Sequence, residues 1–155
     1  MLRKRVLTAL CGIPLLIVAI WYDEPLPWFT ILVAIWGLLA VLEFYKLVAV
    51  SRARVLTCFG LIWTLLFILS PHCSYGLAVP ILLTAGVVLL SVWLVLCSPK
   101  EGNFLIWSWI TAGALYVGWL LSYLVALRLD AGRAWVYLAL FATFGSDTGA
   151  FFIGR

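Results

Sequence analysis

The chain has 155 residues, of which 66% are hydrophobic and only 10% are charged. A soluble domain is typically about half apolar and about one quarter charged, so the composition excludes a soluble globular domain, a disordered chain and a disulfide-stabilised scaffold. The net charge is +4, but the basic residues flank apolar runs and form no basic face, which argues against nucleic-acid binding.

Six apolar stretches follow one another along the chain, and a membrane-spanning helix needs about 20 such residues. They cover residues 6–22, 28–50, 55–70, 77–97, 103–127 and 134–155. The first is followed by acidic residues and prolines instead of a cleavage site, so we expect a retained helix and not a signal peptide. No β-barrel alternation is present. The sequence therefore predicts an all-α polytopic membrane protein with about six transmembrane helices.

The charges at the ends of these stretches predict the orientation of the chain in the membrane. Arg3, Lys4 and Arg5 precede the first stretch, and the positive-inside rule places them in the cytoplasm. Six alternating spans then put most of the remaining basic residues on the cytoplasmic side as well. Since the connecting loops are only a few residues long, we expect residues 1–155 to form a single integral-membrane domain.

The second stretch contains Glu43, and a carboxylate within a span costs about 2.5–3.5 kcal/mol, which makes it a candidate functional group. Lys46 lies three residues further on, where it can form an ion pair on the same helix face. Tyr45 between them suits the aromatic belt at the membrane interface. An interfacial ion pair is therefore the simpler interpretation of Glu43.

The sixth stretch contains the second such carboxylate, Asp147. Small residues recur around it, namely Ala142, Gly145, Ser146, Gly149, Ala150 and Gly154. Small side chains let another helix approach closely, so we expect Asp147 to face the protein interior, toward the cytoplasmic side. With the hydroxyls of Ser146 and Thr148 beside it, this carboxylate offers oxygen ligands to a hard cation such as Mg²⁺. A helix cap or an ion pair is the alternative interpretation.

The segment 146–155, SDTGAFFIGR, resembles the motif S/A-D-S/T-G-A-Y-x-x-G-R/K of CDP-diacylglycerol synthases, the phosphatidate cytidylyltransferases. The segments 43–46 and 115–128 and the opening residues are similar to the same family. Phe151 replaces the usual tyrosine and keeps its ring without the hydroxyl. The family's second signature, S-P-x-K-T-x-x-G, is not present in these 155 residues. The resemblance thus covers the N-terminal portion of the family, and we expect a chain that is incomplete at its C-terminus.

The resemblance implies that CTP and phosphatidate react to give CDP-diacylglycerol and pyrophosphate in phospholipid biosynthesis, with Mg²⁺ as cofactor. It implies that Asp147 is the catalytic residue and metal ligand, and that Ser146, Thr148 and Arg155 assist in binding. Arg155 has an equally simple role as an anchor of the helix end. The resemblance implies a multi-pass protein in the lipid bilayer of the cell (inner or plasma) membrane. It also suggests a homodimer.

Three other functions are weighed against this one. A related CTP-dependent lipid kinase would phosphorylate a polyprenol or phytol, and its products would be a lipid monophosphate and CDP. A proton-coupled transporter would use Asp147 as the proton carrier, but the chain lacks the internal repeat expected of such a protein. A non-catalytic membrane scaffold would pack against a partner through Gly145 and Gly149.

Overall fold

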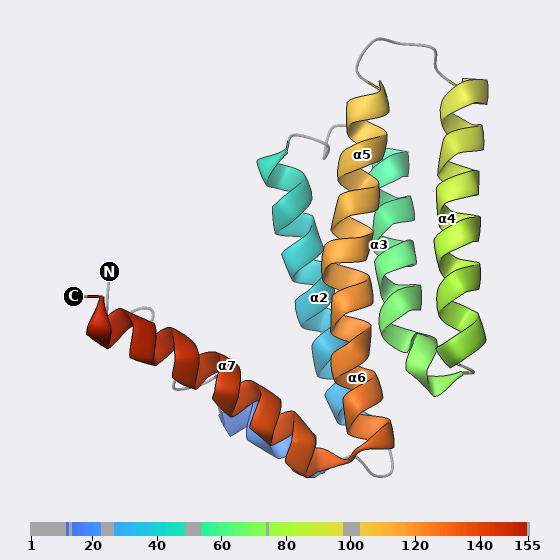
Figure 1. Cartoon of the computed structure of the whole chain (residues 1–155). Coiled ribbons are helices and arrows are strands. Elements are labelled where there is room, and N and C mark those ends of the chain that lie inside the picture. The colour runs from blue at the N-terminus through green and yellow to red at the C-terminus, as the bar shows by residue number, and fades with distance from the viewer. Residues whose placement is uncertain are drawn as a thin grey trace. The chain divides into compact units, whose positions relative to one another are not determined.

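The computed structural model of the chain describes residues 12, 14–22, 27–48, 54–73, 75–97 and 103–154. Within these ranges all regular structure is helical (Figure 1). The elements are α2 (Trp28–Leu47), α3 (Arg54–Leu69), the 3₁₀ turn η2 (Ser70–His72), α4 (Tyr75–Cys97), α5 (Asn103–Gly113), the π-helical η3 (Ala114–Trp119), α6 (Leu120–Asp130) and α7 (Arg133–Ile153). Residues 14–21 form a further helical segment near the N-terminus.

Four helical stretches of the described chain are long and apolar enough to cross a membrane. They are Trp28–Leu47, Val55–His72, Tyr75–Leu96 and Phe104–Asp130. Because they coincide with the second to fifth predicted spans, the all-α polytopic membrane fold is confirmed. The first predicted span begins outside the described residues, and α7 is not among the four stretches. The total of six spans and the cytoplasmic N-terminus stay predictions.

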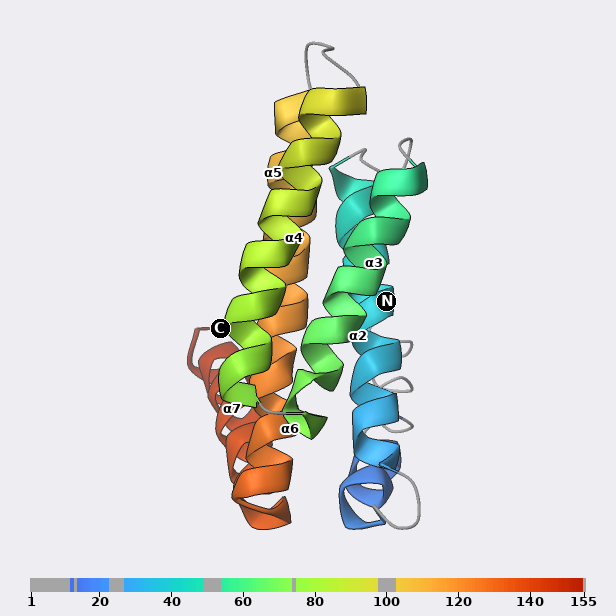
Figure 2. The ribbon, with the colours of Figure 1, turned by 90° about the vertical axis from the view of Figure 1, so that its right-hand side faces the viewer.

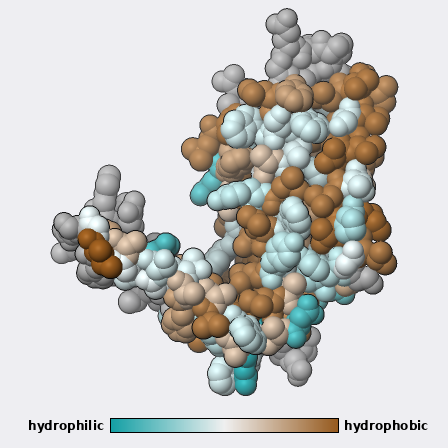
Figure 3. All heavy atoms as spheres, viewed as in Figure 1, coloured by the Kyte–Doolittle hydropathy of each residue, from teal (hydrophilic) through white to brown (hydrophobic). Residues whose placement is uncertain are grey.

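The chain divides into two compact units. Unit 1 comprises Met1–Phe29 and Ala126–Arg155, and unit 2 comprises Thr30–Val125. Unit 2 contains most of the four apolar stretches, and the face seen in Figure 3 shows many hydrophobic side chains over its helices. Unit 1 contains α7 and the segment 14–21. The single integral-membrane domain expected from the sequence stays a prediction.

In unit 2, α2, α3, α4 and the rod formed by α5 and α6 run side by side (Figures 1 and 2). Tyr45, near the C-terminal end of α2, belongs to the buried core of this unit. Its fully buried ring fits between Gly60 of α3 and Gly113 of α5, because neither glycine has a side chain to occupy that space. Its hydroxyl donates a hydrogen bond to the backbone oxygen of Ile110, at 3.1 Å. One aromatic side chain therefore joins three helices.

The helices α5, η3 and α6 follow one another without a break, and the middle segment of this rod is π-helical. Gly118 of η3 packs against α3 so closely that an added Cβ atom would lie 2.9 Å from the Cα atom of Thr64. The π-helical turn therefore coincides with a close approach of two helix backbones. The sequence correctly predicts one span here, although the helix runs three residues past the predicted end at Leu127.

In unit 1, the end of α6 and the first half of α7 contact the helical segment 14–21. Tyr137 Oη donates a hydrogen bond to the Ile17 oxygen at 3.1 Å, Arg128 Nη2 donates one to the Ile20 oxygen at 3.1 Å, and the Arg133 guanidinium lies 4.3 Å from the centroid of the Trp21 ring. These contacts connect two parts of the chain more than a hundred residues apart in sequence.

Candidate functional site

The candidate site lies on α7, which begins after Gly132. The φ angle of Gly132 is 88°, a left-handed value that glycine adopts without a steric cost, and this allows the chain to leave α6 and start a new helix. The first half of α7 includes the fully buried Val136, whereas residues 141–148 are exposed. The half of the helix that carries the motif is therefore the uncovered half.

Asp147 is exposed on α7, and this corrects the expectation that it faces the protein interior. The small residues around it were predicted to allow a neighbouring helix to approach. A Cβ atom added to Gly145 or to Gly149 would meet no atom within 4 Å, so no described residue occupies that position. The stripe of small residues is present as predicted, but it is not covered within the described part of the chain.

Ser146 and Thr148 are exposed as well, and the helix does not bring them to one point with Asp147. Adjacent residues on a helix point in directions about 100° apart, and only residues three or four positions apart share a face. The hydroxyl of Thr148 donates a hydrogen bond to the Phe144 oxygen at 2.7 Å, so its proton is already used and only its lone pairs are free to accept. Of the three motif residues, Asp147 alone offers a carboxylate.

Thr143 shares the face of Asp147, since it lies four residues earlier on the same helix. Its hydroxyl is exposed and donates a hydrogen bond to the Ala139 oxygen at 2.9 Å. The sequence motif does not include this residue. The spacing of four residues is the feature that identifies it as a neighbour of the carboxylate.

No group of three or more His, Cys, Asp or Glu side chains within the described residues lies close enough to hold a metal ion. A cage built from protein ligands alone is therefore not formed by these residues. Mg²⁺ is commonly held by one or two carboxylates together with substrate phosphates and water, and the single exposed carboxylate of Asp147 fits a site of that kind.

The other candidate residues are placed as follows. Arg155 lies outside the described residues. Glu43 and Lys46 are both described and both exposed at the end of α2, and no ion pair joins their side chains. The ion pair expected from their spacing is therefore not formed in the structure. Exposure near a helix end removes the need for one, because water and headgroups at the interface can solvate the carboxylate.

Comparison with known proteins adds one finding to this geometry. A family model described as "Cytidylyltransferase family" matches residues 3–155, a range that includes the whole of α7 and its exposed carboxylate. No curated protein and no solved structure gives a significant match.

Proposed function

We propose, because this chain belongs to the cytidylyltransferase family, that it acts as a phosphatidate cytidylyltransferase. Family membership establishes a CTP-dependent transferase in general terms, and the four apolar stretches establish a membrane protein. The finer proposal is that the acceptor is phosphatidate, that the product is CDP-diacylglycerol and that the cell (inner or plasma) membrane is the location. The observation that carries the proposal is the family match, which extends over the segment around Asp147.

In the proposed reaction, a phosphate oxygen of phosphatidate attacks the α-phosphorus of CTP. The bond between that phosphorus and the oxygen leading to the β-phosphate breaks, and pyrophosphate leaves. No covalent enzyme intermediate is needed. The demands on the protein are to hold two anions in line and to neutralise the charge that develops between them.

The residues of the motif segment 146–155 would divide these tasks. Asp147 would hold Mg²⁺, which when bound supplies positive charge against the phosphate oxygens. Ser146 has a hydroxyl that can donate to a phosphate oxygen, whereas Thr148 can only accept, because its proton is bonded to the Phe144 oxygen. Arg155 would meet a phosphate group through its guanidinium. Asp147 and Ser146 are both exposed, which leaves room for substrate beside each of them.

The membrane helices fit a lipid acceptor. The acyl chains of phosphatidate would remain in the bilayer while its phosphate meets CTP, a water-soluble nucleotide, at the membrane surface. A carboxylate on an apolar helix is expensive to keep in such surroundings, and residues of this kind usually have a function. This reasoning supports the proposal that Asp147 is the Mg²⁺ ligand of the active site.

The proposal is tested by supplying CTP labelled in its α-phosphate or, in a parallel reaction, in its γ-phosphate, together with one of two acceptors, phosphatidate or a polyprenol, in detergent–lipid micelles with Mg²⁺. We expect label in CDP-diacylglycerol with release of pyrophosphate, and no phosphorylation of the polyprenol. Polyprenyl phosphate and CDP as the only products would overturn the proposal and establish the lipid kinase instead. The version of the protein assayed includes the second family signature, and an established phosphatidate cytidylyltransferase serves as positive control.

A further inference from the structure

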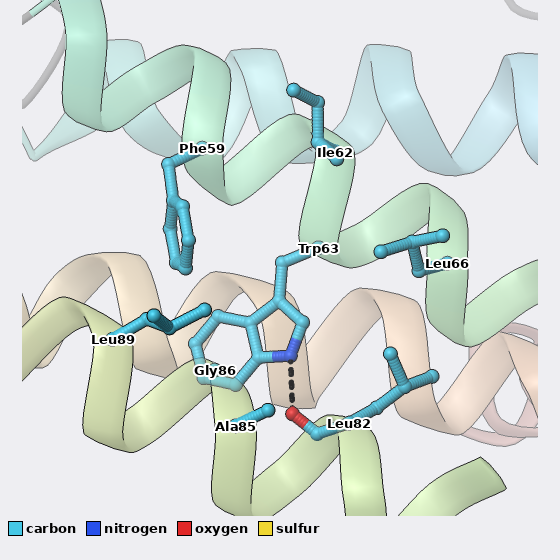
Figure 4. A pocket seen from close by; sticks show the side chains of 8 residues that line it. All are labelled: Phe59, Ile62, Trp63, Leu66, Leu82, Ala85, Gly86 and Leu89. Atoms are coloured by element: carbon cyan, nitrogen blue, oxygen red, sulfur yellow. Dashed lines mark hydrogen bonds between the residues drawn. The ribbon is translucent and has the colours of Figure 1, made fainter.

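An apolar groove lies between α3 and α4 in unit 2 (Figure 4). It has a volume of about 100 Å³. Its walls are formed by four residues of α3, Phe59, Ile62, Trp63 and Leu66, and four of α4, Leu82, Ala85, Gly86 and Leu89. Nothing in the proposed reaction uses these residues.

The floor of the groove is the indole ring of Trp63, which is only 3% exposed. The ring fits against α4 because Gly86 has no side chain, and an added Cβ atom there would overlap the indole. The indole nitrogen donates a hydrogen bond to the Leu82 oxygen at 2.9 Å, as Figure 4 shows. It is the only polar side-chain atom among the lining residues, so the groove offers an occupant no free side-chain donor or acceptor.

The groove opens onto an exposed apolar surface of two candidate membrane-spanning helices. Three of its residues are largely exposed, namely Ile62 (58%), Leu66 (46%) and Leu89 (59%). They belong to two of the stretches that are long and apolar enough to cross the bilayer. The α4 wall lies roughly 10 Å from either end of its helix at 1.5 Å per residue, which is the depth of the hydrocarbon chains and not of the headgroups.

We propose that this groove binds a segment of one hydrocarbon chain of a bilayer lipid. A water molecule needs two or more polar partners, and the side chains lining the groove offer none. A partner helix is about 10 Å across and does not fit a space of this volume. A fluid acyl chain is the material that surrounds the opening, and a few of its methylene groups match the volume.

A filled groove is favoured because an empty one loses dispersion contacts with its walls. The cost of a cavity rises with its volume, and for a closed cavity of this size it corresponds to roughly 50-fold in favour of the filled state. Since the groove is open on one side, that factor is an upper limit. The bound chain would pack against both α3 and α4 and so connect them.

The experiment uses the full chain in phosphatidylcholine vesicles that contain phosphatidylcholine with a photoreactive diazirine in the middle of one acyl chain. After illumination, the labelled residues are identified by peptide mass spectrometry. We expect several-fold more adduct on the groove residues than on Val88, which is 57% exposed on the same helix at a similar depth but does not line the groove. A diazirine in the headgroup should give no enrichment in the groove.

Two variants complete the test. Ala85→Phe places a ring in the opening, and we expect adducts on the groove residues to fall about fourfold or more. Val88→Phe adds a ring outside the groove and should leave them unchanged.

Equal labelling of the groove and Val88 in the parent protein would overturn the proposal, as would groove labelling that Ala85→Phe does not reduce. Crosslinks between two copies in place of lipid adducts would also overturn it. The comparison within the parent protein stays decisive even if Ala85→Phe fails to fold.

Discussion

Asp147 and Glu43 are both exposed carboxylates on apolar helices, but their neighbours differ. Glu43 lies near the end of α2 with Lys46 three residues away, where the membrane interface lowers the cost of its charge. Asp147 is flanked by Ser146 and Thr148 and then by glycine, alanine and phenylalanine, and α7 has no basic residue within four positions of it. This difference makes Asp147 the stronger candidate for a function that needs a negative charge.

The position of Asp147 in the motif was predictable from the sequence, but its exposure was not. A stripe of small residues indicates that a helix can approach, without indicating which residues supply that helix. In the described structure, Gly145 and Gly149 meet no neighbour. The periodicity of the sequence therefore predicted the stripe of small residues on α7 correctly. Its prediction that a neighbouring helix packs against this stripe was wrong for the described part of the chain.

Glycines with and without neighbours should respond oppositely to an added methyl group. Gly60→Ala would push a Cβ atom into the Tyr45 ring, which Gly113 confines on its other side, so we expect a loss of about 1–3 kcal/mol in the free energy of unfolding. Gly145→Ala meets no atom, and it should raise helix stability by about 0.5–1 kcal/mol. Thermal unfolding in detergent, followed by circular dichroism, measures both.

The parent chain and Gly149→Ala serve as controls for this pair, because Gly149 also has no neighbour within 4 Å. A lower unfolding temperature for Gly145→Ala than for Gly60→Ala would contradict the packing described for Tyr45. It would mean that the second half of α7 is covered and that the Tyr45 site tolerates extra volume.

At the level of helices, long apolar stretches predicted the existence and the middle of four spans. Their ends depend on local residues that hydropathy does not weigh. Val55–His72 continues through Pro71 as a 3₁₀ turn, with the Ser70 hydroxyl bonded to the Phe67 oxygen at 2.7 Å. Phe104–Asp130 continues until Gly132 ends it. Hydropathy therefore identified the helices, and turn residues set their lengths.

The π-helical turn and the apolar groove between α3 and α4 were not predictable from the sequence. Both depend on contacts between residues far apart along the chain, such as Gly118 with Thr64 and Trp63 with Gly86. A glycine within a membrane helix suggests a close approach but does not name its partner. Only the folded structure shows that the indole ring of Trp63 packs against Gly86, whereas no described residue packs against Gly145.

At the level of the whole molecule, composition and charge predict a membrane protein and a specific orientation. The orientation is tested by introducing single cysteines in place of Asp23 or Arg54 in a chain whose native cysteines are replaced by serine. We expect a membrane-impermeant maleimide to label the cysteine at Asp23 from outside the cell and the one at Arg54 only after the membrane is opened. The reverse pattern would contradict the predicted cytoplasmic access to Asp147, on which the proposed binding of CTP depends.

The central proposal is that Asp147 is required for cytidylyl transfer to phosphatidate. It rests on the family match over residues 3–155 and on the exposed carboxylate of Asp147. The most direct measurement compares Asp147→Asn with Asp130→Asn in a version of the protein that includes the second family signature. Asp130 is a matched control, because it is an exposed aspartate at the end of another helix. The readout is Mg²⁺-dependent transfer of labelled CMP from CTP to phosphatidate. The account predicts a loss of about a thousandfold for Asp147→Asn and a change within about twofold for Asp130→Asn. Activity of Asp147→Asn within about twofold of the parent protein would contradict it.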